Sequence, residues 1–270
     1  MDTIQKILDK IIQTYPFLND QELNTFSKAA KEIASNKDYS ELDAIKNILK
    51  LLSNNHADIK VVSSGGIKFE KPSYVLENNL LIVTIPSWSK SQGDFSDGLI
   101  KMCCDNVDKC KAVILDVREN QGGDSTIAHK FASIFFNKPV SYGKFVRRIN
   151  NQIVSSQGIL NPHKSIFIDK PLAILISKKC YSSNELFIAP FKISKRAVLI
   201  GQKTAGGSGN PVSENITIDN IQYRVRIPTW RFFLEGSDKP IEETVIIPDI
   251  ECDSSQAMEI AVRYFTDKIK

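Results

Sequence analysis

Ser182 and Ser183 follow a short apolar strand and open a predicted helix, within the sequence ISKKCYSSNELF. A serine in the first turn of a helix has its hydroxyl near the positive end of the helix dipole, beside backbone N–H groups that have no partner within the helix. Such a hydroxyl can act as a nucleophile. It also fits an ordinary helix cap, because Glu185 stands three residues after Ser182 and completes a capping box. From this segment alone the cap is the favoured interpretation.

A second turn contains Gly122 and Gly123, between an apolar strand ending at Asp116 and an amphipathic helix. Adjacent glycines at such a turn leave N–H groups pointing outward beside a helix N-terminus, where they can bind an anion or a developing oxyanion. A tight turn that needs a positive φ at one glycine has the same sequence. The two interpretations are equally supported by the glycines alone.

His56 is the third candidate, at the point where a helical segment gives way to strands. A histidine there can serve as a general base, although a single histidine at such a boundary is more often structural. His129 lies inside the helix after the glycine pair and His163 lies in a polar loop, so we expect packing or surface roles for these two.

These candidates need a scaffold that brings distant segments together. Apolar residues recur at helical spacing through residues 2–55, which predicts a small helical segment. Short apolar runs then alternate with helical patterns, which is typical of an α/β core with buried strands. We therefore predict an N-terminal helical segment over residues 1–57 and an α/β domain over residues 58–270.

Composition is that of an ordinary globular protein. The 270 residues are 42% hydrophobic and 24% charged, and 35 basic against 31 acidic residues give a net charge of +4. We expect no nucleic-acid or membrane partner, since the charge is small and the apolar runs fall short of the roughly 20 residues of a membrane span. Five cysteines lack metal-ligand spacing, so we expect reduced thiols and no metal site. The amino terminus does not look like a secretory signal, which predicts a cytoplasmic location, or a periplasmic or secreted one if a leader precedes it.

Several segments in this order resemble the S41 peptidases: LLSNNHADI, VILDVRENQGG, ISKKCYSSNELF, VLIGQKTAGG and PIEETVIIPDIE. The resemblance implies a ClpP/crotonase-like β-β-α core with an N-terminal helical segment. In the family's Ser-x-x-Glu pattern the nucleophile is Ser182. The same pattern implies an oxyanion hole formed by the backbone N–H of Ser183 and one from the turn of Gly122 and Gly123.

The resemblance also bears on the base. One S41 group uses a lysine, and Gly207 stands at that position here; Lys203 and Lys178 are the remaining lysine candidates. The tricorn-like group uses a histidine, which His56 matches. That group also has a glutamate ahead of a Pro-Asp pair, which Glu242 matches, with Glu243 as the neighbouring alternative. The family's linking serine before the histidine is replaced by Asn55.

The resemblance therefore implies a serine peptidase that hydrolyses peptide bonds through a Ser182 acyl-enzyme, with His56 as general base and Glu242 orienting it directly or through Asn55 or water. It implies a peptide or protein substrate, either endopeptidase or carboxyl-terminal processing activity, and no cofactor. The stretch between His56 and residue 80 is too short for a PDZ domain. A non-catalytic binding module for an apolar ligand or peptide is the alternative function, and homo-oligomer formation is left open.

Overall fold

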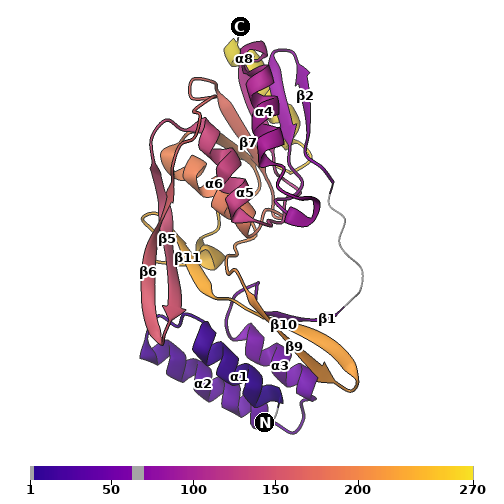
Figure 1. The fold of residues 1–270 in the computed structure, drawn as a ribbon, viewed down its shortest axis with the longest axis vertical. Helices are drawn as coiled ribbons and strands as arrows, with labels where there is room; N and C mark the ends of the chain where they lie inside the picture. The colour runs from indigo at the N-terminus through magenta and orange to yellow at the C-terminus, as the bar shows by residue number, and fades with distance from the viewer. Residues whose placement is uncertain (1–2, 63–69, 270) are drawn as a thin grey trace.

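The computed structural model describes residues 3–62 and 70–269 (Figure 1). The helices are α1 (Thr3–Thr14), α2 (Asp20–Ser35), α3 (Glu41–Lys50), α4 (Ser96–Asn106), α5 (Ser125–Ala132), α6 (Ser183–Ser194), α7 (Ile241–Thr244) and α8 (Ala257–Ile269), with 3-10 turns η1 (Lys90–Gln92), η2 (Val107–Lys109) and η3 (Ser133–Phe135). The strands are β1 (Asp58–Val61), β2 (Ser73–Glu77), β3 (Leu80–Thr84), β4 (Ala112–Asp116), β5 (Val140–Ile149), β6 (Gln152–Leu160), β7 (Leu172–Ile176), β8 (Val198–Gly201), β9 (Val212–Ile218), β10 (Ile221–Ile227), β11 (Trp230–Leu234) and β12 (Ile250–Glu251).

The six-stranded sheet has the order β12-β8-β7-β4-β3-β2 and is parallel except for β2, which pairs antiparallel with β3. Every residue of β4 and β7 is buried. This burial explains their uninterrupted apolar sequences, because helices cover both faces of the sheet. Residues of α4, α5 and α6 belong to the core on one face, and α8 packs on the other. The predicted α/β fold is confirmed.

A second core forms where α1, α2 and α3 pack against the sheet β1-β10-β9. Ile7, Ile45 and Val225 are all fully buried in it. Strands from two distant parts of the chain thus complete the hydrophobic face of the helical segment, in the lower part of Figure 1. The division predicted between residues 57 and 58 stays a prediction, since β1, β9 and β10 share their core with the helices.

Three hairpins are closed by two-residue turns in which both residues have positive φ. This is the type I′ geometry that matches the twist of paired strands and favours asparagine. One of these hairpins joins β5 to β6 in the sheet β11-β5-β6, which the sequence analysis did not anticipate. In Figure 1 it runs along one side of the molecule from the six-stranded sheet towards the helices. The turn residues are Asn78 and Asn79, Asn150 and Asn151, and Asp219 and Asn220.

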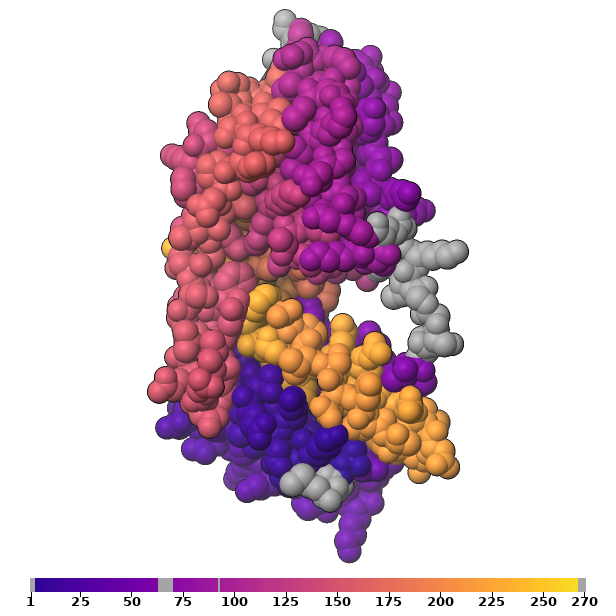
Figure 2. Space-filling view, in the orientation of Figure 1, coloured from indigo at the N-terminus to yellow at the C-terminus, as the bar shows by residue number. Residues whose placement is uncertain are grey.

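The carboxyl ends of β4, β7 and β8 lead into the segments singled out from the sequence. Open parallel sheets commonly place ligands at this edge. Figure 2 shows the molecule hollowed on one face between the six-stranded part and the part that contains β9 and β10. Within residues 3–62 and 70–269, the helices are too short or too polar to span a membrane.

Candidate active site

Ser182 lies in the turn between β7 and α6 with φ 59° and ψ −127°. A non-glycine residue in this region is strained, and such strain persists only where the surroundings enforce it. Here the Ser182 N–H faces the Gly207 carbonyl at 3.1 Å and the Glu185 carboxylate at 3.2 Å. A serine on a strained strand-to-helix turn, with its hydroxyl exposed above the sheet, is the arrangement used by nucleophiles in α/β hydrolases.

His56 lies against this hydroxyl, with its Nε2 2.9 Å from the Ser182 Oγ. The imidazole is buried, and its backbone N–H donates to the Asn54 side-chain oxygen at 2.9 Å. Burial and, to a smaller extent, the positive charge of Arg226 lower the pKa of His56 to about 4, although Asp58 acts in the opposite direction. The ring is therefore neutral at neutral pH, which is the form that can accept a proton.

Tyr181 also contacts this histidine, at the ring nitrogen that does not face Ser182. Its hydroxyl lies 2.7 Å from the His56 Nδ1, and the two rings stack with centroids 4.5 Å apart and planes 17° apart. No sequence pattern predicted a role for Tyr181. The available signal was its position directly before Ser182, together with the absence of a side chain at Gly207.

The space beside Gly207 is filled by that tyrosine. A Cβ built on Gly207 would lie 2.0 Å from the Tyr181 Cε2, so no side chain fits there without moving the ring. Lys203 and Lys178, the other lysine candidates, are exposed, and neither lines the cavity above Ser182. In the described part of the chain, His56 is thus the basic side chain in contact with the Ser182 hydroxyl.

Glu242 does not touch the imidazole. Its Oε1 accepts hydrogen bonds from the Asn54 side-chain amide at 2.8 Å and from the Ser208 N–H at 3.1 Å. Asn54 in turn accepts the His56 backbone N–H, so the connection reaches the histidine main chain rather than its ring. Of the three links considered from the sequence, direct, through Asn55 or through water, the Asn55 side chain does not make the second, because it donates to the Gly206 carbonyl at 3.2 Å.

Glu243, the alternative glutamate, points elsewhere. Its side chain is 55% exposed and lies 3.8 Å from Lys239. Glu242 is partly buried, and this burial raises its pKa. Its Oε2 is buried and has no hydrogen-bond partner within the described residues. Of the two glutamates, Glu242 is therefore the one that faces the site.

The two glycines of the β4–α5 turn differ in what their N–H groups do. The Gly122 N–H donates to the Asn120 side chain at 2.8 Å, so the expectation that it serves an oxyanion hole is wrong. Among the described residues, the N–H groups of Gly123 and Ser183 have no acceptor, and both residues line the cavity with Ser182. The Ser183 hydroxyl donates to the Gly123 carbonyl at 2.8 Å and ties the two segments together. Free N–H groups beside a nucleophile are suited to binding an oxyanion.

Glu185 holds the Ser182 turn against the loop after β8. Its carboxylate accepts hydrogen bonds from the Thr204 hydroxyl at 2.6 Å, the Gly206 N–H at 3.0 Å and the Gly207 N–H at 2.7 Å, besides that of Ser182. Burial raises the pKa of Glu185 to about 8, and these four donors act in the opposite direction. The capping glutamate thus connects the nucleophile segment to the segment that contacts Tyr181.

The cavity above Ser182 has a volume of about 500 Å³ and lies between the six-stranded sheet and the β9–β10 sheet. Trp230 lines this cavity, whereas the nearby Phe232 and Phe233 are buried. The cavity wall combines polar, aromatic and aliphatic side chains, and includes Gln121, Thr126, Leu186, Asn210, Arg226 and Trp230.

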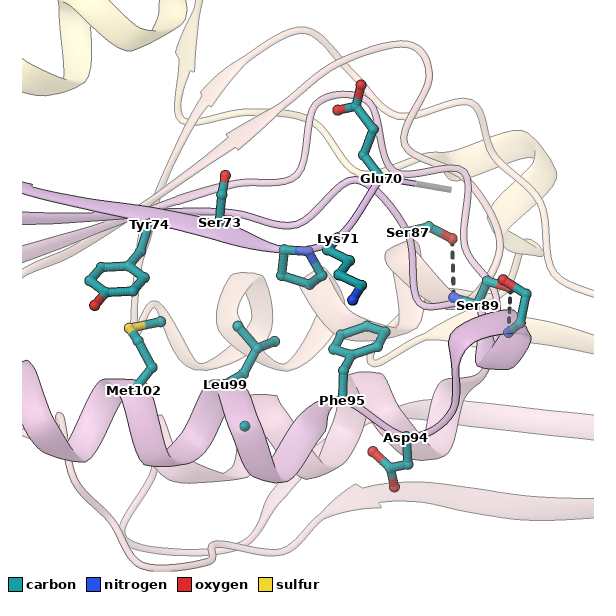
Figure 3. Close-up of a pocket in the computed structure, with 13 residues that line it drawn as sticks. Glu70, Lys71, Ser73, Tyr74, Ser87, Ser89, Asp94, Phe95, Leu99 and Met102 are labelled. Carbon is teal, nitrogen blue, oxygen red and sulfur yellow. Dashed lines mark hydrogen bonds between the residues drawn. The ribbon is translucent and has the colours of Figure 1, made fainter. Parts of the chain in front are cut away.

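A second cavity of about 450 Å³ lies between β2 and α4 (Figure 3). Tyr74 faces it from β2, and Phe95, Leu99 and Met102 face it from α4 and the residue before it. It contains none of the candidate catalytic residues. The cavity above Ser182 is therefore the one that fits the predicted chemistry.

Comparison with known proteins shows which family the chain belongs to. The model of peptidase family S41 matches residues 79–252. A nisin-resistance protein of Lactococcus lactis is 24% identical over 92% of this chain and 81% of its own length. A "Probable CtpA-like serine protease" of Staphylococcus haemolyticus is 27% identical over 54% of this chain, and the match spans only 28% of that longer protein.

Solved structures share the fold. A Parabacteroides merdae protein assigned provisionally to the peptidases superposes with a TM-score of 0.72 at 18% identity, over 97% of this chain and 95% of its own. A lipoprotein from Streptococcus agalactiae gives 0.64 at 21% identity, over 98% and 95%. The photosystem II D1 C-terminal processing protease gives 0.52 at 17%, over 70% and 50%. Because the family model covers more than half of the sequence, the chain belongs to peptidase family S41.

Proposed function

We propose that this S41 family member is a serine peptidase in which Ser182 is the nucleophile and His56 is the general base. The observation that carries the proposal is the 2.9 Å contact between the Ser182 Oγ and the Nε2 of a buried histidine. A serine hydroxyl is a weak nucleophile until a positioned base removes its proton, and a neutral imidazole within hydrogen-bond reach can do so.

In the proposed reaction the Ser182 Oγ attacks the carbonyl carbon of a peptide bond while its proton passes to the His56 Nε2. The carbonyl oxygen becomes an oxyanion, and the N–H groups of Gly123 and Ser183 are available to stabilise it. The imidazolium then protonates the leaving amine, which leaves an acyl-enzyme on Ser182. Water, deprotonated by His56, attacks that ester and releases the second product.

A serine-directed phosphonate probe tests this assignment. The wild-type protein should be labelled, and the Ser182→Ala and His56→Ala variants should not, because the probe needs an activated hydroxyl. Ser255→Ala and His163→Ala are matched controls, since both residues are exposed and outside the cavity, and they should label normally. Labelling that survives Ser182→Ala would contradict the proposal, and binding of an apolar ligand unaffected by that change would favour the non-catalytic alternative.

The identity of the peptide substrate can be tested directly. The relative from Lactococcus lactis makes nisin one peptide to test, alongside a peptide library. Mass spectrometry of the products would distinguish the two proposed activities. A carboxyl-terminal processing enzyme should release short C-terminal fragments and respond to amidation of the substrate terminus, whereas an endopeptidase should cut internal bonds irrespective of that change.

A further inference from the structure

We infer that Tyr181 is a positioning residue whose hydroxyl holds His56 in the tautomer that can accept the Ser182 proton. This inference rests on the proposed function. It starts from the two ring nitrogens of His56, which have different partners: Nε2 faces the Ser182 hydroxyl at 2.9 Å and Nδ1 faces the Tyr181 hydroxyl at 2.7 Å.

The chemistry of a neutral imidazole fixes what the tyrosine must do. A neutral ring carries one N–H, so Nε2 can accept a proton only when the hydrogen is on Nδ1. The group at Nδ1 must then be a hydrogen-bond acceptor, and Tyr181 supplies a phenolic oxygen there. If the phenol donated instead, the hydrogen would be on Nε2 and Ser182 would have no base.

Tyr181 takes the place that a carboxylate has in the Ser-His-Asp triad, with one difference. Burial raises the pKa of Tyr181, so the phenol stays neutral while the reaction proceeds. During attack, the proton moves from the Ser182 Oγ to the His56 Nε2, and the Nδ1–H remains bonded to the tyrosine oxygen. The tyrosine neither gains nor loses a proton. It stabilises the imidazolium by holding the ring in place and by accepting a hydrogen bond as an uncharged group.

The surroundings hold the phenol ring in this position. It stacks on the imidazole on one side and approaches Gly207 on the other, where a Cβ would come within 2.0 Å of the ring. Gly207 is itself fixed, because its N–H donates to Glu185 at 2.7 Å and its carbonyl faces the Ser182 N–H at 3.1 Å. Tyr181 and a side chain at position 207 therefore exclude each other.

This steric exclusion explains why residue 207 is a glycine. Position 207 matches the site of the lysine base in one S41 group, and here the space for such a side chain is taken by Tyr181. A tyrosine directly before the serine and a glycine at position 207 form a matched pair. Together they define an arrangement in which the base is a histidine that a neutral phenol orients.

The experiment is nitrogen NMR of protein labelled with ¹⁵N-histidine, read at pH 7. Only three histidines contribute, and His56→Ala identifies the signals of interest. The wild-type protein should show His56 as the Nδ1–H tautomer. Tyr181→Phe keeps the ring and removes the acceptor, so the signals should move to the Nε2–H tautomer. Tyr142→Phe is the matched control, because Tyr142 is buried next to His129 and should leave the His56 signals unchanged.

Kinetics give a second measurement on the same variants. Loss of the tautomer-fixing group costs about 10⁴ in kcat in a Ser-His-Asp peptidase. Because Tyr181 is a neutral partner, we expect Tyr181→Phe to lower kcat by roughly 10- to 100-fold with little change in KM. A purely structural role would predict similar tautomer signals and a lower melting temperature instead.

Two results would overturn the inference: a wild-type His56 with its hydrogen on Nε2, or a Tyr181→Phe variant with the wild-type tautomer and kcat within about twofold of wild type. The NMR measurement needs no turnover. If the phosphonate probe fails to label Ser182, the proposed function fails, while the tautomer result still decides whether Tyr181 positions the histidine.

Discussion

Glu185 is fully buried and Glu242 is partly buried near the Ser182–His56 pair, and the two carboxylates are bonded in different ways. Both oxygens of Glu185 accept hydrogen bonds, four in all. One oxygen of Glu242 accepts two, and the other has no partner within the described residues. From the sequence, Glu185 was predicted to be only a helix cap, and Glu242 was predicted to be the group that orients the base. The contacts of a carboxylate, more than its match to a motif, indicate what it does.

The difference has a physical origin in the loop after β8. Glu185 gathers the backbone N–H groups of Gly206 and Gly207 in addition to that of Ser182, so it fixes two segments at once. Glu242 contacts His56 only indirectly: it accepts a hydrogen bond from Asn54, which accepts one from the His56 backbone N–H. Substitution of Glu185 should therefore disturb both Ser182 and Tyr181, whereas substitution of Glu242 should have a smaller effect on stability and activity.

Glu185→Ala should have the largest effect. It removes the acceptor of three donors, the Thr204 hydroxyl and the N–H groups of Gly206 and Gly207, whereas the Ser182 N–H keeps the Gly207 carbonyl. Because a buried unsatisfied donor costs about 1–3 kcal/mol and water can reach some of them, we expect a loss of about 3–5 kcal/mol in the free energy of unfolding. Urea unfolding measures this loss. Glu243→Ala is the control, since that side chain is 55% exposed, and it should change stability by less than about 0.5 kcal/mol. Similar values for the two variants would remove the distinction drawn for Glu185.

Gly207→Ala should come next, with an effect on activity more than on folding. The added methyl group would lie 2.0 Å from the Tyr181 ring, so the ring must leave its place against His56. We expect kcat to fall roughly 10- to 100-fold, as for loss of the phenol itself. Gly98→Ala is the matched control, because a Cβ there meets nothing within 4 Å and alanine favours the helix.

The double variant sharpens this test. If Gly207→Ala acts by displacing the ring, then adding it to Tyr181→Ala should cost little more, because the two changes remove the same contact. Additive losses in kcat would show that residue 207 affects the site by another route.

Much of the fold could be predicted from local patterns, whereas Ser182 was singled out as the candidate nucleophile only through the family resemblance. The strands β4 and β7 are continuous apolar runs because both faces of their sheet are covered, and this pattern is visible without coordinates. The predicted contact partners Ser182 and His56 do lie together, although 126 residues separate them. Here the family resemblance supplied what spacing could not.

The remaining features depend on three-dimensional contacts that no local pattern encodes. Asn54 and Asn55 are adjacent and chemically identical, and only the direction of each side chain decides which one reaches Glu242. The β5–β6 hairpin was missed although its Asn150–Asn151 turn is a recognisable signal. Three N–H groups were candidates for binding an oxyanion, and two of them remain because the Gly122 N–H donates to the Asn120 side chain.

Glu242→Gln should have the smallest effect, and it tests the comparison most directly. Glutamine keeps a carbonyl oxygen for the N–H groups of Asn54 and Ser208, and its amide can stand where the carboxylate oxygen has no partner. Burial already raises the pKa of Glu242, which favours an uncharged side chain at this place. We expect kcat/KM to fall by no more than about threefold, which corresponds to roughly 0.65 kcal/mol.

The pH profile of kcat/KM shows whether Glu242 acts on the imidazole. Burial and the charge of Arg226 lower the pKa of His56 to about 4, and Asp58 acts in the opposite direction. Glu242 is not among the groups that shift this pKa. Activity should fall as the pH drops through about 4, where the ring becomes protonated and can no longer accept the Ser182 proton, and it should be level from about pH 5 to 7. A glutamate that stabilised the imidazolium directly would raise this pKa, so its neutralisation would move the acid limb to lower pH. An acid limb that stays in place in Glu242→Gln supports a role through the backbone, whereas a shift of one unit would place Glu242 at the ring.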